Sequence, residues 1–124
     1  MDDLRERYFG PTFELMSHDK YVEIWDLDER DPFLPLEGGE SVDNVASRLA
    51  GAVETMESEY EGCAILVISH GDPLQILQTI MLAAKRHKEE ICELASRFRK
   101  TRVRDVLSEH RKFAMLTGQL VPII

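Results

Sequence analysis

Ala64-Ile65-Leu66-Val67-Ile68-Ser69-His70-Gly71-Asp72-Pro73-Leu74 is an apolar run that leads directly into a histidine, a glycine and a helix start. Its first five residues are apolar and partly β-branched, a pattern typical of a strand covered on both faces of a parallel sheet. Asp72 is a favoured N-cap and Pro73 suits the first helical position, so a helix is expected to begin just after Gly71. His70 would then lie beside the free N–H groups of a helix, where an anion binds well.

Helical periodicity predicts further helices on both sides of this strand. One short helix is expected around residues 21–27, ended by Asp31-Pro32, since the residue before a proline resists the helical conformation. The clearest helix follows Ser41 as N-cap and is ended by Glu61-Gly62, with one apolar face: Val42, Val45, Ala46, Leu49, Val53, Met56 and Tyr60. Another helix is expected from Pro73 to about Ala84.

The tail of the chain predicts one more helix and a hairpin. Apolar residues recur at helical spacing over 91–98, and two short apolar runs within 112–121 flank the turn Thr117-Gly118. The alternation of helix, strand and helix indicates an α/β fold in a single domain over residues 1–124. The length of 124 residues, with 44% hydrophobic and 31% charged residues, suits one core in a soluble globular protein.

Composition excludes several classes of function. The apolar runs are too short to span a bilayer and the acidic start does not resemble a signal peptide, so a cytoplasmic protein is expected, and Cys63 and Cys92 suggest free thiols. The net charge of −8 argues against binding to nucleic acid. Residues 1–62 carry a net charge of −12 and residues 63–124 one of +4, which favours packing of one half on the other or head-to-tail association.

Common catalytic and metal-binding motifs are missing as well. Val67-Ile68-Ser69-His70-Gly71 has valine where a serine-hydrolase turn needs its first glycine. The four histidines show no spacing typical of metal ligands, and no phosphate-binding glycine loop of the P-loop or dinucleotide type occurs. Of the chemistries considered for this chain, phosphate chemistry at His70 is the one that remains.

Three motifs occur in order along the chain: Leu4-Arg5-Glu6-Arg7-Tyr8-Phe9-Gly10, Gly38-Gly39-Glu40-Ser41 and Ser69-His70-Gly71-Asp72. In type, order and spacing they resemble the histidine phosphatase superfamily, in its phosphoglycerate-mutase-like branch, and the tail Glu109-His110-Arg111-Lys112-Phe113 is similar to the segment before a late strand of that family. The resemblance implies a three-layer αβα domain that acts on a phosphorylated small molecule through a phosphohistidine, without a metal or cofactor.

The resemblance also implies roles for individual residues. His70 matches the second histidine of the family, which hydrogen-bonds the transferring phosphoryl group, and Glu6 matches its general acid and base. Arg7 would contact phosphate or substrate, since a guanidinium matches phosphate in a bidentate way, and Gly71 would offer a backbone N–H.

One departure from the family concerns the nucleophile. The family's first histidine, in an Arg-His-Gly motif, has no counterpart here, because His70 is the only histidine followed by glycine and Ser69 precedes it. We therefore expect an N-terminally truncated domain, a fragment or short isoform, whose sheet lacks its central strand and which has little or no activity alone. The alternative is a non-catalytic binding or regulatory module that pairs through its open edge with a second copy or with a full-length homologue.

Overall fold

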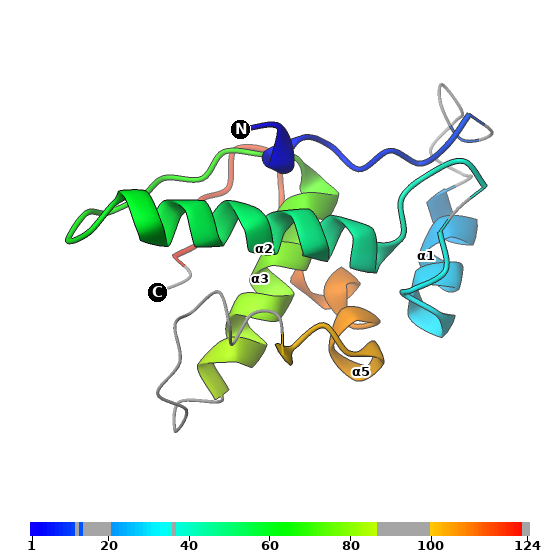
Figure 1. Cartoon of the computed structure of the whole chain (residues 1–124). Coiled ribbons are helices and arrows are strands. Elements are labelled where there is room, and N and C mark those ends of the chain that lie inside the picture. The colour runs from blue at the N-terminus through cyan, green and yellow to red at the C-terminus, as the bar shows by residue number, and fades with distance from the viewer. Residues whose placement is uncertain (12, 14–20, 36, 87–99, 123–124) are drawn as a thin grey trace.

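The described part of the computed structural model, residues 1–11, 13, 21–35, 37–86 and 100–122, is built from helices (Figure 1). In chain order they are η1 (Asp2–Leu4), α1 (Tyr21–Arg30), α2 (Val42–Glu59), α3 (Gly71–Arg86), α5 (Arg104–Leu107) and η3 (His110–Phe113). These residues contain no strand, so the predicted α/β class, with its three-layer αβα sheet architecture, is wrong for the described chain.

The predicted strand at residues 64–68 is an irregular connection between α2 and α3. Within the described residues, no backbone hydrogen bond joins residues 63–69 to another segment, and the side chains of Leu66 and Ile68 are 67% and 76% exposed. An apolar run becomes a strand only where a neighbour pairs with its backbone and covers its side chains. Here no described segment pairs with the backbone, and of these side chains only Val67 packs against the core. The predicted hairpin fails for the same reason, although the turn at Thr117-Gly118 forms, with Gln119 N–H donating to the Leu116 carbonyl over 3.0 Å.

The helices that rest on local signals are confirmed. Helix α1 ends at Arg30, just before Asp31-Pro32. At the start of α2 the Ser41 hydroxyl accepts from Asn44 N–H at 3.0 Å and the Asn44 side chain accepts from Ser41 N–H at 2.8 Å, which is a reciprocal capping box. Helix α3 begins at Gly71, earlier than expected, and the helix predicted over 91–98 lies outside the described residues.

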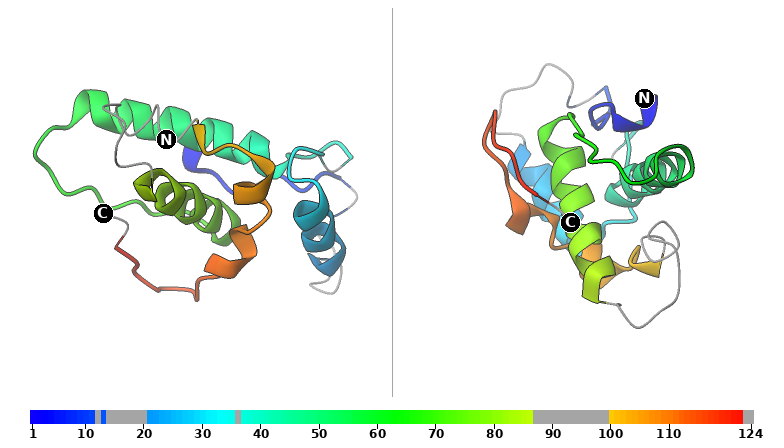
Figure 2. Two further views of the ribbon diagram at one scale, coloured as in Figure 1. Left: turned by 90° about the horizontal axis from the view of Figure 1, so that it is seen from below. Right: turned by 90° about the vertical axis from the view of Figure 1, so that its left-hand side faces the viewer.

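The core lies where α2 crosses α3. The right-hand view of Figure 2 shows the crossing, with α2 seen end-on and α3 seen along its length. Both helices turn their apolar face inward, and Leu107 of α5 closes the cluster, which comprises Val42, Val45, Ala46, Leu49, Ala50, Val53, Ile76, Leu77, Ile80, Met81 and Leu107. On the outside, Arg102 binds Asp43 of α2 through two hydrogen bonds of 2.9 and 2.8 Å, so one basic residue of the second half does pair with the acidic first half. None of the helices in the described segments combines the length and hydropathy needed to cross a bilayer.

The N-terminal segment is fastened to the start of α2 by close backbone approach and by one arginine. A Cβ atom on Gly39 would lie 2.7 Å from Gly10 N, and Gly10 itself has a φ of +91°, which favours glycine. Arg48 of α2 donates to the carbonyl oxygens of Asp3, Arg5 and Glu6 at 2.6, 2.9 and 3.3 Å. These contacts hold residues 3–10 against α2. Glu6 lies in the middle of this segment.

Candidate functional site

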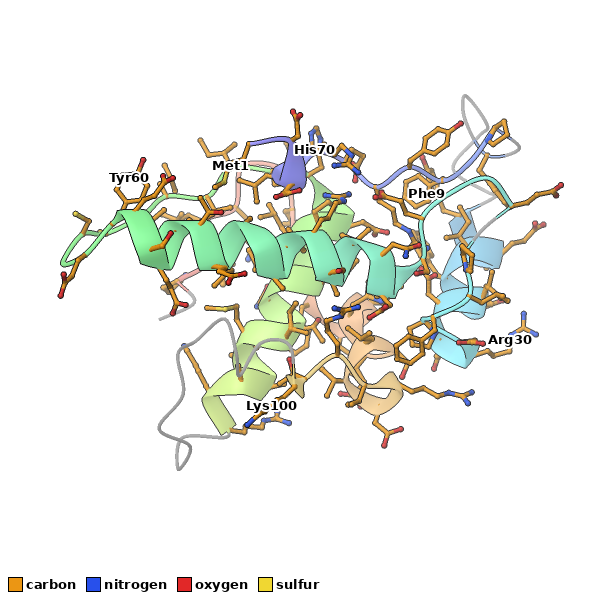
Figure 3. The ribbon with its side chains drawn as sticks, in the orientation of Figure 1. Met1, Phe9, Arg30, Tyr60, His70 and Lys100 are labelled. Atoms are coloured by element: carbon orange, nitrogen blue, oxygen red, sulfur yellow. The ribbon has the colours of Figure 1, made fainter. Side chains whose placement is uncertain are left out.

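His70 and Glu6 come together at the start of α3. His70 Nδ1 lies 3.7 Å from Glu6 Oε2, an ion-pair distance longer than a hydrogen bond, and the two side chains are 57% and 45% exposed. Figure 3 shows His70 beside the N-terminal segment, and Ser69, its neighbour, anchors this contact by donating its hydroxyl to the Leu4 carbonyl at 2.5 Å. The pair therefore faces solvent and is free to meet a ligand.

The ionisation of Glu6 is shifted by its surroundings. Burial raises the pKa of the Glu6 carboxyl above its usual 4.5, while the Arg7 N–H bond and the charge of His70 act in the opposite direction. The Arg7 N–H donates to Glu6 Oε1 at 2.8 Å, which leaves Oε2 turned to His70. A carboxyl group with a raised pKa keeps its proton to a higher pH than a free glutamate does, which favours a role in proton transfer.

The first turn of α3 supplies backbone donors next to His70. Leu74 N–H donates to the His70 carbonyl at 3.0 Å, and Pro73 has no N–H. The N–H groups of Gly71 and Asp72 are therefore the donors of this helix end that have no backbone partner among the described residues. Gly71 lacks a side chain that would cover them. The positive end of the helix dipole and these two donors favour an anion beside His70.

A cavity of about 470 Å³ opens at this helix end. Its walls are the connection before α3 and the tail after η3, with Glu6 at one side: Glu6, Leu66, Val67, Ile68, Ser69, His70, Gly71, Leu74, Met115, Leu116, Thr117, Gly118, Gln119 and Leu120. Leu116 and Leu120, from the tail, are 81% and 77% exposed. We call this the His70 cavity; one end is polar, at Glu6 and His70, and its walls are aliphatic.

Arg7 is buried away from the His70 cavity. Its guanidinium binds Asp28 of α1 through two bonds of 2.7 and 2.8 Å, Asp72 of α3 at 3.1 Å, and the Glu40 carbonyl at 3.1 Å. The residue is 1% exposed and does not line the cavity. The structure thus gives the arginine that was expected at the phosphate a set of partners inside the protein.

His110 of η3 completes this buried group, which we call the Arg7 cluster: Arg7, Asp28, Asp72 and His110. His110 Nδ1 lies 3.3 Å from the Leu107 carbonyl, and Nε2 lies 3.8 Å from Asp28 Oδ2 with no hydrogen-bond partner. Ligand atoms of Asp28, Asp72 and His110 lie within 4.8 Å of one another, but Arg7 occupies both carboxylates, so the donor set does not suit a metal ion while Arg7 is in place.

Glu40, which precedes α2, connects the N-terminal segment to α2. Its carboxylate accepts from Arg48 at 3.0 and 3.1 Å and from Tyr8 N–H at 2.9 Å. Burial by itself raises the pKa of Glu40, but these hydrogen bonds outweigh it and bring the pKa below the usual 4.5. Glu6 is therefore held by contacts on both sides, from Glu40 with Arg48 and from the Arg7 cluster.

The chain matches the family described as "Histidine phosphatase superfamily (branch 1)" over residues 1–115. The chain belongs to the histidine phosphatase superfamily. Comparisons with curated proteins and with solved structures gave no match. Members of this superfamily act on phosphorylated substrates, which sets the chemistry to be sought at His70.

The structure brings together three of the four residues that the sequence singled out. His70, Glu6 and Gly71 lie together, whereas Arg7 lies behind them. Asp28 and His110 were missed as partners of Arg7. Asp28 had a signal, because it follows the buried Ile24 by four residues and so shares the buried face of α1. For His110 no local pattern marks burial.

Proposed function

We propose that this chain carries the acid/base half of a histidine phosphatase site and binds the phosphoryl group of a phosphomonoester. The observation that carries the proposal is the exposed Glu6–His70 pair, 3.7 Å apart, at the polar end of the His70 cavity. A phosphoryl group at this position would meet the His70 ring and the N–H groups of Gly71 and Asp72. Phosphoryl transfer depends mainly on positioning and on charge stabilisation, which these groups supply.

Glu6 would act as the general acid and base of the reaction. When a nucleophile attacks phosphorus and the ester P–O bond breaks, the leaving oxygen takes a proton, and a carboxyl group with a raised pKa is able to give it. In the second step the carboxylate would take a proton from the water that attacks the phosphorylated nucleophile. His70 would donate a hydrogen bond to the phosphoryl oxygens in both steps.

The nucleophile has to come from outside these 124 residues. The superfamily uses a histidine of an Arg-His-Gly motif, and no such motif stands in this sequence. One histidine cannot attack phosphorus and at the same time donate to the group it attacks. We therefore propose that these residues by themselves bind a phosphoryl group but do not turn over a phosphomonoester.

Phosphate binding and turnover test the two parts of this proposal separately. Inorganic phosphate should shift the His70 ring and Gly71 amide resonances in a saturable way, and His70→Ala should abolish the amide shift, whereas Lys112→Ala should retain it. An activated aryl phosphate should not be hydrolysed. Failure to bind phosphate contradicts the site, and turnover that His70→Ala removes contradicts the missing nucleophile.

A second candidate function rests on the walls of the His70 cavity. The connection 63–69 has no backbone partner in the described chain, and Leu66, Ile68, Leu116 and Leu120 are all more than two-thirds exposed. Unpaired backbone beside exposed aliphatic side chains is the kind of surface that takes up an extended peptide. The chain would then be a binding module whose partner contributes an extended apolar segment, a second copy of the chain being the simplest case.

Solution mass distinguishes this module from a self-sufficient monomer. Sedimentation equilibrium between about 1 and 100 µM should show association if a second copy fills the cavity. Leu116→Lys, which places a charge on the cavity wall, should shift the mass toward the monomer, while Val22→Lys, on the exposed side of α1, should leave it unchanged. A folded monomer over the whole range contradicts association through a second copy.

A further inference from the structure

The Arg7 cluster joins four segments by groups that the phosphate chemistry does not use. Arg7 belongs to the N-terminal segment, Asp28 to α1, Asp72 to α3 and His110 to η3, and each is at least 92% buried. Arg7 directly follows Glu6, and Asp72 follows His70 by two residues. The Arg7–Asp72 bond of 3.1 Å therefore fixes the two segments that carry Glu6 and His70.

The unpartnered atom of the cluster is His110 Nε2. Among the described residues, the acceptor at the other ring nitrogen, Nδ1, is the Leu107 carbonyl at 3.3 Å, so we assign the proton of the neutral ring to Nδ1. Nε2 is then a lone pair, buried without a hydrogen bond and 3.8 Å from Asp28 Oδ2, which is itself a lone-pair donor. Two such atoms repel each other unless a proton or another hydrogen-bond donor comes between them.

Charge balance decides which positive charge fits. With neutral His110, the cluster holds two carboxylates and one guanidinium, a net charge of −1. One proton on Nε2 would bring the net charge to zero. A divalent metal ion would bring it to +1 in a buried site and would compete with Arg7 for both carboxylates, which is costly.

We propose that His110 is a positioning residue that acts as a pH-sensitive latch: its protonation draws Asp28 Oδ2 from Arg7 Nη1 to His110 Nε2. This loosens the attachment of the N-terminal segment that holds Glu6 beside His70, while the bonds of Arg7 to Asp28 Oδ1, to Asp72 and to the Glu40 carbonyl remain. Asp28 Oδ2 is the shared atom, since Arg7 Nη1 reaches it at 2.7 Å and His110 Nε2 lies 3.8 Å away. A shift of about one ångström in η3 or α1 would bring His110 Nε2 within hydrogen-bond distance of Asp28 Oδ2. The protonated His110 ring and the Arg7 guanidinium would then compete for this oxygen.

The direction of the pH effect follows from the surroundings of His110. Burial lowers its pKa below the usual 6.5; the carboxylates of Asp72 and Asp28 oppose this, and the charge of Arg7 adds to it. The folded protein thus binds this proton less readily than the unfolded chain. Stability contributed by neutral His110 is complete above pH 6.5 and is lost as the pH falls from 6.5 toward the lower pKa of the folded state.

Trp25, the single tryptophan of the chain, reports on this junction. It lies on α1, and the guanidinium of Arg111, the residue after His110, stacks 3.7 Å from its ring centre. Between pH 8 and 5 the emission of Trp25 should change in one step below pH 6.5, and His110→Gln should remove the step. His70→Gln, which removes the exposed histidine of the site, should retain it.

Nuclear magnetic resonance of the unmodified protein provides a test that does not depend on a folded variant. The His110 ring should titrate below 6.5, and the Arg7 amide resonance, whose N–H donates to Glu6, should shift at the same pH, because the N-terminal segment loosens. This readout needs neither phosphate nor turnover, so it can fail independently of the proposed function, on which the role of Glu6 rests. A His110 pKa at or above 6.5, or an Arg7 amide that does not follow the His110 titration, overturns the latch.

Zinc ions serve as the competing probe. At pH 7.5, Zn²⁺ alone should leave the midpoint of thermal unfolding unchanged. The reason is that a divalent ion would give the buried Arg7 cluster a net charge of +1. A zinc-dependent rise in the midpoint that His110→Gln abolishes would show that the cluster takes a metal ion, and the latch would then be rejected.

Discussion

At the scale of single residues, the candidate site depends on groups that do not line the His70 cavity. Arg7 shows this most clearly, because its guanidinium neutralises two buried carboxylates while its backbone N–H orients Glu6. Buried ion pairs add little net stability, but removing one partner leaves the other charge without compensation. The residue that looked like a phosphate ligand is thus a support for the residue beside it.

Replacement of Arg7 should therefore be costly to the fold. Arg7→Met leaves Asp28 and Asp72 buried without a cation, and we expect a loss of about 3–5 kcal/mol in the free energy of unfolding, measured by urea denaturation. Arg5→Met is the matched control, since Arg5 is 54% exposed and its pair with Glu40 should contribute less than about 1 kcal/mol. Similar losses in both variants would contradict the assignment.

The crossing of two glycines gives a second residue-scale prediction. In Gly39→Ala the new Cβ would lie 2.7 Å from Gly10 N and from Phe9 C, so backbone has to move, at a cost of about 1–3 kcal/mol. Gly51→Ala, inside α2 with its nearest neighbour at 3.7 Å, should instead stabilise by about 0.5–1 kcal/mol. Thermal unfolding of the two variants compares them directly, and a neutral Gly39→Ala contradicts the close approach.

At the scale of elements, local sequence signals predicted the helix boundaries that depend on neighbouring residues. Ser41 and Asn44 close the start of α2, and Asp31-Pro32 follows the end of α1, so both boundaries could be derived from a few neighbouring residues. A strand depends on a partner that can be distant in sequence or belong to another chain, which is why residues 64–68 could not be assigned from their composition alone.

The capping box gives the element-scale prediction. Ser41→Ala removes the acceptor of the Asn44 N–H bond and should lower the free energy of unfolding by about 0.5–2 kcal/mol. Ser58→Ala, near the exposed end of the same helix, should change it by less than about 0.5 kcal/mol. Equal effects in chemical denaturation would mean that the cap does not contribute.

At the scale of the whole molecule, the candidate site is better predicted by its motifs than by the fold. His70 and Glu6 are separated by 63 intervening residues, yet the order of family motifs placed them together. The Arg7 cluster could not be derived in this way, because burial of a charged residue depends on the packing of four segments. Motif order thus carries information about chemistry that residue periodicity lacks.

The exposed aliphatic walls of the His70 cavity give a prediction for the whole molecule. Hydrophobic dyes such as anilinonaphthalene sulfonate should bind the native chain, because Leu66, Ile68, Leu116 and Leu120 are exposed together at one cavity. Leu116→Lys should weaken dye binding severalfold with little change in thermal midpoint, since the side chain is 81% exposed and supports no core contact. If the native protein does not increase the fluorescence of the dye, the walls of the cavity close on each other in solution.

The open walls of the His70 cavity also bear on how long the chain survives in a cell. Chaperones and proteases recognise exposed aliphatic side chains on irregular backbone, and both features meet at residues 65–68. A molecule whose cavity is filled would hide this signal, while an unfilled one would display it. The abundance of the protein would then follow the supply of whatever fills the cavity, so that quality control removes the surplus.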